Sequence, residues 1–405
     1  MSLNRTNADA ALKEDYQPAI REQLNQSNVI LAQIEANDKD FEGRRAVLSL
    51  HTSRNQGVGA RAENGTLPIA GQQGYTEQRV PVFHNYGRIQ VSGPVIDAMK
   101  SDRGSFTRAI DSEVTGMTTD LKRDYTRQIF GTSNGVIAGT GTTSSSTTIV
   151  LAASTTLTQM RQFEAGARID IGTVAAPATV ADSRTIQSVD RANRTITVDG
   201  AAVSTTAGTH FVFREDAGGA GPAQKEITGL QTIVSATGAL HNVDPATVPV
   251  WSSTVDSNGG VLRSPSDTLF ESVMDEVFVE SGEDINFIVT SFGVKRAYAN
   301  GLKDQKRFSN TIDLKGGFKA LSVDTGRGEI ALAADRDCPE NTAFLLNMGH
   351  ITHFVNSDWE WMDKDGAILS RVPNTDAYEA TLYKRSELAT DRRSAHGRIN
   401  DLATA

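Results

Sequence analysis

The sequence predicts an α+β protein, and three features indicate this class. A long amphipathic helix is expected between Ser105 and Gly131, short β-rich runs follow from Ile149 to Phe213, and helical and strand patterns alternate from Ser266 onward. The chain of 405 residues is long enough for roughly two or three domains or lobes.

The composition excludes several classes of protein. Forty Lys and Arg residues against 49 Asp and Glu residues give a net charge of −9, which argues against a protein whose main task is to neutralise phosphates, although it is compatible with a wall that encloses nucleic acid. Cys338 is the only cysteine, so an intramolecular disulfide and a cysteine-based zinc cluster are excluded, and a reducing compartment fits. The segment from Met1 to Leu12 lacks the apolar core of a signal peptide, and no apolar run approaches the length of a membrane span. We therefore expect a soluble protein without a standard export signal.

The N-terminal part predicts helix followed by a long hairpin. Apolar residues recur at largely helical spacings from Asp15 to Glu35, which predicts one or two amphipathic helices. Turn-forming residues dominate positions 55 to 75, and a strand-like run follows from Thr76 to Ser92, with Pro81 at an edge position. This glycine-rich hairpin has little apolar content at its tip and cannot form a core alone, so we expect it to lie on another surface.

The helix between Ser105 and Gly131 is the clearest element. Ser105 is a suitable N-cap and Gly131 a suitable C-cap. About 26 residues at 1.5 Å each make a rod of roughly 39 Å, and Gly116 within it costs about 1 kcal/mol relative to alanine. The apolar residues form one stripe at spacings of three and four: Phe106, Ile110, Val114, Met117, Leu121, Tyr125 and Ile129.

A small all-β insertion is expected after this helix. Residues 139 to 148 contain only Gly, Ser and Thr, which is typical of a linker. Asp190 to Asn193 joins two of the following runs as a hairpin, and glycines 218, 219 and 221 close the insertion. The β-rich runs are Ile149–Leu151, Ile169–Ile171, Thr185–Val189, Thr195–Val198 and His210–Phe213.

The last third of the chain predicts mixed helices and strands. Ser266 or Asp267 caps a helix that runs to about Ser281, and a second helix begins at Ser291. The segment from Lys303 to Lys319 is basic and contains glycine. Strands are expected at Phe287–Thr290, Ile330–Ala334, Ala343–Leu346, Ile351–Val355 and Tyr378–Leu388.

Two motifs permit a catalytic interpretation, and both fit a turn better. Gly131, Ser133 and Gly135 match the nucleophile elbow of hydrolases, but that elbow needs a strand before the serine and a helix after it, whereas here the long helix comes before. Asp324 begins an Asp-Thr-Gly triplet like that of aspartic proteases, but a single copy would need a homodimer to complete the carboxylate pair. A β-turn is therefore favoured for both motifs.

No pattern predicts a metal or cofactor site. His350 and His353 lie three residues apart, which in a strand places them on opposite faces and is poor for shared metal ligation. The basic cluster Lys303, Lys306 and Arg307 could contact phosphate, but a solvated or intersubunit loop is favoured. We therefore predict no catalytic, cofactor or metal-binding residues.

Six short segments, in this order and spacing, carry a resemblance to a known family: Tyr86–Gly93, Arg127–Gly131, Gly229–Gln231, Phe287–Ser291, Asp335–Pro339 and Arg392–Gly397. With the N-terminal arm and the long helix, they are similar to the major capsid proteins of tailed bacteriophages, which have the Hong Kong 97 type fold. The similarity covers nearly the whole chain apart from the β insertion.

The resemblance implies a Hong Kong 97 type α+β fold. Its expected parts are an N-terminal arm (1–56), an E-loop (57–92), a P-domain with a long spine helix and β-sheet (93–140), an all-β insertion domain (141–221), a P-domain continuation (222–264), an A-domain (265–345) and a P-domain return with the C-terminus (346–405).

The resemblance also implies a structural function and no enzymatic activity. Copies of the chain are expected to form hexamers and pentamers of an icosahedral virion capsid around double-stranded DNA, without sequence-specific binding, membrane or cofactor. Assembly is expected in the host cytoplasm with a scaffolding protein, a portal and a possible decoration protein. The expected intersubunit contacts are Arg61, Tyr75, Arg79, Arg88, Lys303, Lys306 and Arg307.

Covalent crosslinks between subunits are not expected. The type member of the family forms them through an E-loop lysine, and this sequence has no lysine between Lys39 and Lys100. Two alternatives stay open: an encapsulin-like compartment and, from a different class, a hydrolase that uses Ser133 or Asp324. A virion decoration protein built mostly of β structure is a third possibility, and the long helix argues against it.

Overall fold

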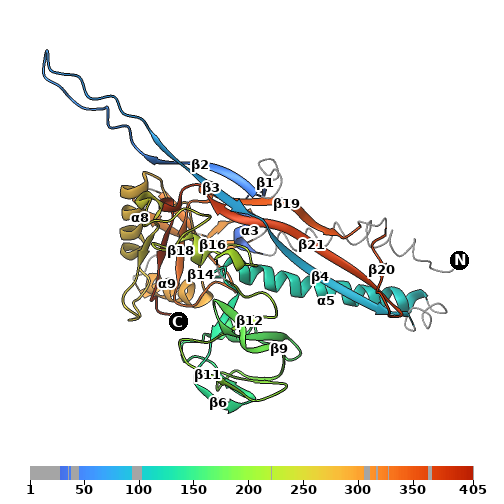
Figure 1. The fold of residues 1–405 in the computed structure, drawn as a ribbon. Helices are drawn as coiled ribbons and strands as arrows, with labels where there is room; N and C mark the ends of the chain where they lie inside the picture. Colours follow the sequence, from blue (N-terminus) through green and yellow to red (C-terminus); the bar gives the residue numbers. More distant parts are fainter. Residues whose placement is uncertain are drawn as a thin grey trace. The chain divides into compact units, whose positions relative to one another are not determined.

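The computed structural model describes residues 28–34, 36–37, 45–93, 103–219, 221–304, 311–315, 318–326, 328–363 and 367–404. They divide into two units, each assembled from separate stretches of chain (Figure 1). The first unit takes its residues from the N-terminal stretch up to Glu35, Val82–Gly229 and Val355–Glu387. The second unit takes Ala36–Pro81, Leu230–Phe354 and Leu388–Ala405. Helices and strands are mixed throughout, which confirms the α+β class.

The predicted long helix is α5 (Arg103–Ile129), in the first unit. It begins before Ser105, which therefore lies in the first turn and is not the N-cap. Val114, Tyr125 and Ile129 of the apolar stripe are buried. Gly131 follows the helix end, where its N–H donates a hydrogen bond of 2.9 Å to the carbonyl oxygen of Gln128. No helix in the part of the chain that the structure describes is long and apolar enough to cross a membrane.

The strand run predicted from Thr76 to Ser92 is two strands, because it is interrupted after Pro81. β3 (Gly74–Pro81) belongs to the second unit, whereas β4 (Phe83–Ser92) pairs antiparallel with β21 (Ala377–Thr390) in the first. The same sheet contains β20 (Ser370–Arg371), β19 (Ile351–Trp361) and β1 (Ala36–Asn37). β19 and β21 contain the predicted strands Ile351–Val355 and Tyr378–Leu388.

Helix α5 packs against β4, and a glycine permits the close approach. A Cβ atom at Gly87 would lie 2.6 Å from Leu121 Cδ1 and 3.0 Å from Met117 Sδ. Real Cβ atoms do not approach that closely, so a larger residue at this position would push the helix away from the strand.

A β module follows α5, as the sequence predicts. The stretch predicted as a linker is wrong in part, because it includes β6, which is paired with β11 and has the buried Thr143. Asp190 Oδ1 accepts the N–H groups of Ala192 (3.0 Å) and Asn193 (3.1 Å), which confirms the predicted hairpin. The N–H of Gly219 donates to the Asn134 carbonyl at 3.1 Å, close to where the module begins.

The strands of the module are β5 (Val136–Gly139), β6 (Thr143–Ser146), β7 (Thr148–Val150), β8 (Arg168–Thr173), β9 (Ala176–Asp190), β10 (Thr195–Val198), β11 (Val203–Thr205) and β12 (Phe211–Arg214). One sheet has the order β5-β12-β8-β9-β10-β7. Short helices α6 (Leu157–Met160) and η2 (Gly221–Ala223) accompany them. The core of the module includes Phe163, Ile169, Ile171, Ile196 and Val212.

A mixed sheet of order β13-β22-β18-β14-β17-β16-β15 forms the centre of the second unit. Its strands are β13 (Thr254–Asp256), β14 (Phe287–Thr290), β15 (Thr311–Asp313), β16 (Lys319–Thr325), β17 (Gly328–Ala334), β18 (Ala343–Leu346) and β22 (Gly397–Ile399). They include the predicted strands Phe287–Thr290, Ile330–Ala334 and Ala343–Leu346.

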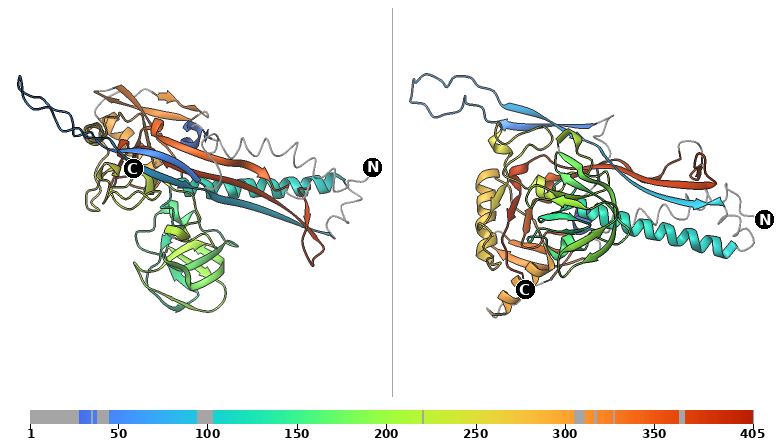
Figure 2. Two further views of the ribbon diagram at one scale, coloured as in Figure 1. Left: turned by 45° about the horizontal axis from the view of Figure 1, so that its top comes forward. Right: turned by 60° about the horizontal axis from the view of Figure 1, so that its bottom comes forward.

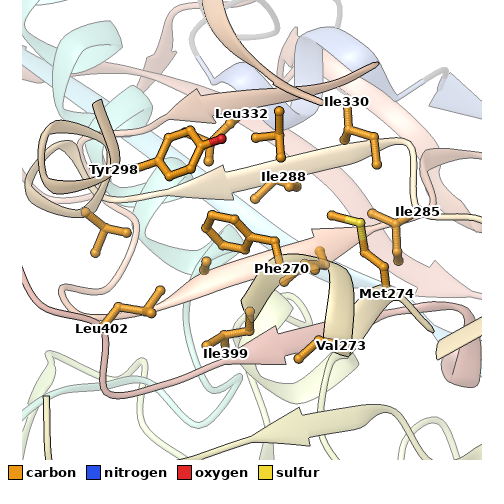
Figure 3. Close-up of a cluster of buried hydrophobic side chains, with 14 of the residues drawn as sticks. Phe270, Val273, Met274, Ile285, Ile288, Tyr298, Ile330, Leu332, Ile399 and Leu402 are labelled. Atoms are coloured by element: carbon orange, nitrogen blue, oxygen red, sulfur yellow. The ribbon is translucent and has the colours of Figure 1, made fainter. Parts of the chain in front are cut away.

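Helices α8 (Asp267–Ser281) and α9 (Phe292–Asp304) cover this sheet. Ser266 is the N-cap of α8, since its hydroxyl accepts the Leu269 N–H at 3.3 Å, and Gly282 ends the helix with a φ of 75°. Figure 3 shows how Phe270 and Met274 of α8 and Tyr298 of α9 meet Ile288 and Leu332 of the sheet. Burial of this apolar layer holds the helices on the sheet.

A hairpin of β2 (Arg45–Ser53) and β3 extends from the second unit. Its first strand begins before the turn-rich stretch at 55–75, within residues that the sequence suggested for the N-terminal arm. Ala46 and Val80 at its root pack with Phe354 and Ala389, whereas residues 54–73 form an irregular loop that reaches away from the sheet of this unit (Figure 1).

Short elements complete the described chain. Of the predicted N-terminal helices, the structure describes α3 (Val29–Gln33), where Asn28 Oδ1 accepts the Ile30 N–H at 2.7 Å; the remainder of that prediction lies outside the described residues. The other short helices are α7 (Leu230–Ile233), η3 (Pro249–Trp251), η5 (Met348–His350) and η6 (Arg393–Ala395).

Candidate assembly surface

The hairpin loop exposes apolar side chains that its own unit does not cover. Val58 is 84% exposed, Leu67 79% and Ile69 90%. The two sides of the loop approach closely, because a Cβ at Gly57 would lie 2.9 Å from the Ile69 carbonyl oxygen. The loop is therefore narrow and presents apolar side chains to the outside, as expected of a surface that binds another protein.

Three of the predicted contact residues lie on this hairpin. Arg61 folds back on the loop, since its Nε donates to the Thr66 carbonyl at 3.0 Å. Tyr75 is 65% exposed and meets the His51 ring edge-on, with 5.5 Å between ring centroids. Arg79 pairs with Glu77 at 2.7 Å, and its hydrogen bond and charge lower the pKa of Glu77. Both partners are about half exposed, so this ion pair contributes little to folding.

A tight turn ties the root of the hairpin to the second unit. His241 and Asn242 both have positive φ, 48° and 67°. Asn242 Oδ1 accepts the Arg79 N–H at 2.7 Å, and Asn242 Nδ2 donates to the Glu77 carbonyl at 3.0 Å. Gln78 Nε2 lies 3.1 Å from His241 Nδ1. Burial, and then the charge of Arg393, lower the pKa of His241 to about 3, so it stays neutral and can accept this hydrogen bond.

The remaining predicted contact residues are not on the hairpin. Arg88 lies on β4 of the first unit, where it forms an ion pair with Glu379 of β21 and remains about half exposed. Lys303 lies in α9, and the structure does not describe its side chain. Lys306 and Arg307 lie outside the described residues.

The structure places Ser133 in a bend after helix α5 and Asp324 in strand β16. Ser133 is 5% exposed and follows helix α5, and its hydroxyl accepts the Gly229 N–H at 3.0 Å. This is the reverse of the strand-turn-helix order of a nucleophile elbow. Asp324 pairs with Glu329 near the end of the β16–β17 hairpin, with Thr325 opposite Gly328. The β-turn predicted for the Asp-Thr-Gly triplet is therefore wrong for Asp324 and Thr325, which end β16, and only Gly326 lies in the turn.

The predicted histidine pair is separated. His350 ends η5, with Nδ1 2.8 Å from Asp391 Oδ1 and Nε2 3.6 Å from Glu283 Oε2, whereas His353 is buried in β19. Among the residues that the structure describes, no group of three or more His, Cys, Asp or Glu side chains could hold a metal ion.

The first unit contains buried ion pairs that the sequence did not predict. Arg127 of α5 pairs with Glu226 and Asp124, and Lys384 of β21 pairs with Asp358. The signal for Lys384 was available, since it falls in step with the inward residues Ala380 and Leu382 of a strand with period two.

The fold is that of a tailed-bacteriophage major capsid protein of the Hong Kong 97 type, with a long helix beside a sheet, an extended hairpin and a separate sheet-and-helix unit. A family model described as SU10 major capsid protein matches residues 173–403. This is more than half of the chain, and the chain belongs to that family.

A solved capsid structure is similar in fold, and two other solved structures match this chain with lower TM-scores. A chain in the cyanophage A-1(L) capsid asymmetric unit is 12% identical with a TM-score of 0.53, and the match covers 95% of this chain and 93% of that one. The holo-SrpI encapsulin complex from Synechococcus elongatus PCC 7942 is 11% identical with a TM-score of 0.41, covering 82% and 78%. A Mycobacterium phage Bobi chain is 8% identical with a TM-score of 0.44, covering 99% of both. A comparison with curated protein sequences gave no match.

Membership of this family defines a structural role. The chain is a major capsid protein that assembles with copies of itself into the shell of the virion capsid.

Proposed function

We propose that the chain assembles as hexamers and pentamers into an icosahedral shell that encloses double-stranded DNA. The exposed hairpin loop carries this proposal. Val58, Leu67 and Ile69 are 84%, 79% and 90% exposed, and a subunit that leaves such residues in water gains by burying them against a neighbour. Many modest contacts of this kind, repeated by symmetry, stabilise a closed shell.

The parts of the fold take the roles that the family resemblance suggested. We assign the N-terminal arm to 1–56, the E-loop to 57–92, the P-domain to 93–140, 222–264 and 346–405, the insertion domain to 141–221 and the A-domain to 265–345. The E-loop would also include strand β2, because the hairpin begins at Arg45. In this scheme Arg61, Tyr75, Arg79, Arg88, Lys303, Lys306 and Arg307 contact neighbouring subunits.

The proposed shell is free of covalent crosslinks and has no enzymatic activity. The hairpin has no lysine to form an isopeptide bond, since none occurs between Lys39 and Lys100. The net charge of −9 argues against phosphate neutralisation as the main task and is compatible with a wall that encloses DNA without sequence-specific binding. Assembly would take place in the host cytoplasm with a scaffolding protein and a portal, and a decoration protein could bind later.

Substitution of the apolar loop residues tests the proposal. We expect the combined variant Val58→Asp, Leu67→Asp and Ile69→Asp to stay folded by circular dichroism and to form no shells by electron microscopy. Leu157→Asp, which changes a residue of the β module that is 61% exposed, is the control and should assemble normally. Normal shells from the triple variant would contradict the role of the loop.

Four further measurements test the finer claims. Shells should show fivefold and sixfold capsomers by electron microscopy, and virions should protect DNA from nuclease. Denaturing gels of mature particles should show only monomeric chain, whereas a ladder of oligomers would contradict the absence of crosslinks. Ser133→Ala with Asp324→Ala should leave particles intact.

A further inference from the structure

Helix α8 of the second unit has an outward face of unusual composition. The helix buries Phe270, Val273, Met274 and Val277 against the sheet. Its 15 residues include no Lys or Arg. The opposite side, which we call the acidic patch, exposes Asp275, Glu276, Val279 and Glu280, and Val279 at its centre is 82% exposed.

Helix α9 has an outward face of the opposite charge. It buries Val294, Tyr298 and Leu302. Phe292 and Arg296 are both exposed and lie four residues apart, which places them on one face of the helix. We call Phe292, Lys295 and Arg296 the basic patch. Phe292 is 55% exposed, and Lys295 Nζ donates to the Lys319 carbonyl at 3.0 Å.

Part of the charge of each patch has no ion-pair partner among the residues that the structure describes. Glu276, Glu280 and Arg296 form no ion pair with any other residue that the structure describes. Each patch therefore combines an exposed apolar residue with uncompensated charge, the combination found where an apolar anchor is surrounded by charged residues in a protein interface.

We propose that the acidic patch of one copy binds the basic patch of the next copy. Val279 and Phe292 would supply the apolar contact, and Glu276 and Glu280 would face Arg296. A self-matched contact of two acidic patches would bring like charges together, which costs several kcal/mol in general. Opposite charges favour the contact of unlike patches and steer the encounter.

This pairing is directional, because each copy uses a different patch at each of two contacts. In the right-hand view of Figure 2, α8 (gold) and α9 (orange) lie along different borders of the second unit. A contact of this head-to-tail kind adds copies in one rotational sense and closes into rings when the rotation permits. The inference rests on the proposed assembly of like subunits and names one surface that joins them.

Charge reversal and its repair test the pairing. We expect Glu276→Lys with Glu280→Lys to reduce the amount of ring-shaped capsomers and shells by about tenfold at equal protein concentration, as measured by sedimentation and electron microscopy. Arg296→Glu alone should cause a similar loss. The triple variant restores opposite charges in reversed order, so it should assemble to within about threefold of the wild type.

Matched controls separate this pairing from general effects of charge. Asp182→Lys with Asp216→Lys reverses two exposed charges on the β module and should assemble like the wild type, and circular dichroism should show every variant folded. Normal assembly of the double variant at 276 and 280, or failure of the triple variant to recover, overturns the pairing while wild-type shells still support the proposed function. A wild-type chain that remains monomeric under all conditions overturns both.

Discussion

Lys384 and Asp358 form an ion pair in which the lysine side chain is 1% exposed, with Nζ 3.0 Å from Oδ1. The ammonium group also lies 5.4 Å from the ring centroid of Tyr125 and 5.7 Å from that of Trp359. The aromatic faces and the carboxylate together replace the water that the cation loses on burial. This arrangement fixes β21 against β19 and α5 within the first unit.

Removal of the lysine charge tests this arrangement. We expect Lys384→Ala to lower the free energy of unfolding by about 2–3 kcal/mol, because it leaves a cavity and removes the cation that pairs with Asp358. Lys384→Met fills most of the space between the rings and should cost less than Lys384→Ala. Urea unfolding of the unassembled subunit measures both, with the half-exposed Lys225→Ala as a control that should change stability by less than about 0.5 kcal/mol. Equal losses for the alanine and methionine variants would show that the charge, and not the packing, dominates.

A second buried charge cluster predicts an asymmetric result. Burial alone would lower the pKa of Arg127, but the charges of Asp124 and Glu226 outweigh it and hold that pKa above its usual range. Burial raises the pKa of Glu226, which is 4% exposed. The positive charge of Arg127 therefore pairs with two carboxylates, Asp124 and Glu226. Glu226 is only one of the two negative charges that pair with Arg127.

Arg127→Met should consequently destabilise the subunit more than Glu226→Gln. We expect losses of about 3–5 kcal/mol and about 1–2 kcal/mol, because the methionine variant leaves the buried Glu226 without its arginine and beside the partly exposed Asp124, while the glutamine variant leaves Arg127 paired with Asp124. Thermal and urea unfolding give both values. A larger loss for Glu226→Gln would mean that Asp124 does not hold the arginine.

Periodicity predicted the elements whose burial follows one simple pattern. Three features could be predicted because each depends on near neighbours in the sequence. They are the apolar stripe of α5, the four buried residues of β14 and the Ser266 cap of α8. The Gly, Ser and Thr residues at 139–148 misled the prediction, since β6 owes its existence to pairing with β11 about 60 residues away.

The surroundings of the expected contact residues could be predicted less completely than the fold. Arg61, Tyr75 and Arg79 lie on the exposed hairpin, but the sequence could not show that Asn242 and His241 hold its root, because that turn is more than 160 residues distant in the chain. The exposed apolar side chains of the loop were also missed. The composition of the loop indicated few apolar residues. It could not predict that three of them, Val58, Leu67 and Ile69, are exposed.

The glycine at the crossing of β4 and α5 makes a third prediction. Gly87→Ala should lower the free energy of unfolding by about 1–3 kcal/mol, because the added Cβ would lie within 2.6 Å of Leu121 Cδ1. Leu121→Ala in the same chain removes the obstructing atom, so the double variant should lose less than the sum of the two single variants. Gly229→Ala is the contrasting case. Its Cβ would meet the backbone carbonyl of Gly131 at 2.3 Å, and no side-chain truncation can relieve that. Additive losses for Gly87 and Leu121 would exclude a direct clash.

Acid should weaken the second unit through His396. This ring is fully buried, its Nδ1 lies 3.3 Å from the Asn347 N–H that donates to it, and its Nε2 lies 3.0 Å from Thr390 Oγ1. Because Nδ1 accepts a hydrogen bond, it carries no proton and the ring is neutral. A second proton would have to bind at Nδ1, where it would face the N–H of Asn347. Burial, and then the charge of His350, lower the pKa of His396 to about 3.

The direction of the pH effect follows from this lowered pKa. An unfolded histidine has a pKa near 6.5. Below that pH the unfolded chain therefore binds a proton that His396 in the folded chain does not bind, and this stabilises the unfolded state. The contribution is complete above about pH 6.5 and is lost progressively as the pH falls toward 3. Between pH 7 and pH 5 it amounts to about 2 kcal/mol. His241 acts in the same direction, because its pKa is also lowered to about 3.

Urea unfolding at pH 7 and pH 5 separates the two histidines. His396→Gln should be less stable than the wild type at pH 7, and it should lose about 2 kcal/mol less than the wild type when the pH falls to 5, with the remaining loss due partly to His241. The exposed His51→Gln is the matched control. The change in stability between the two pH values is the informative quantity, because a purely structural role of His396 would lower stability equally at both. An unchanged difference would therefore show that His396 binds its proton equally well in the folded and unfolded chain.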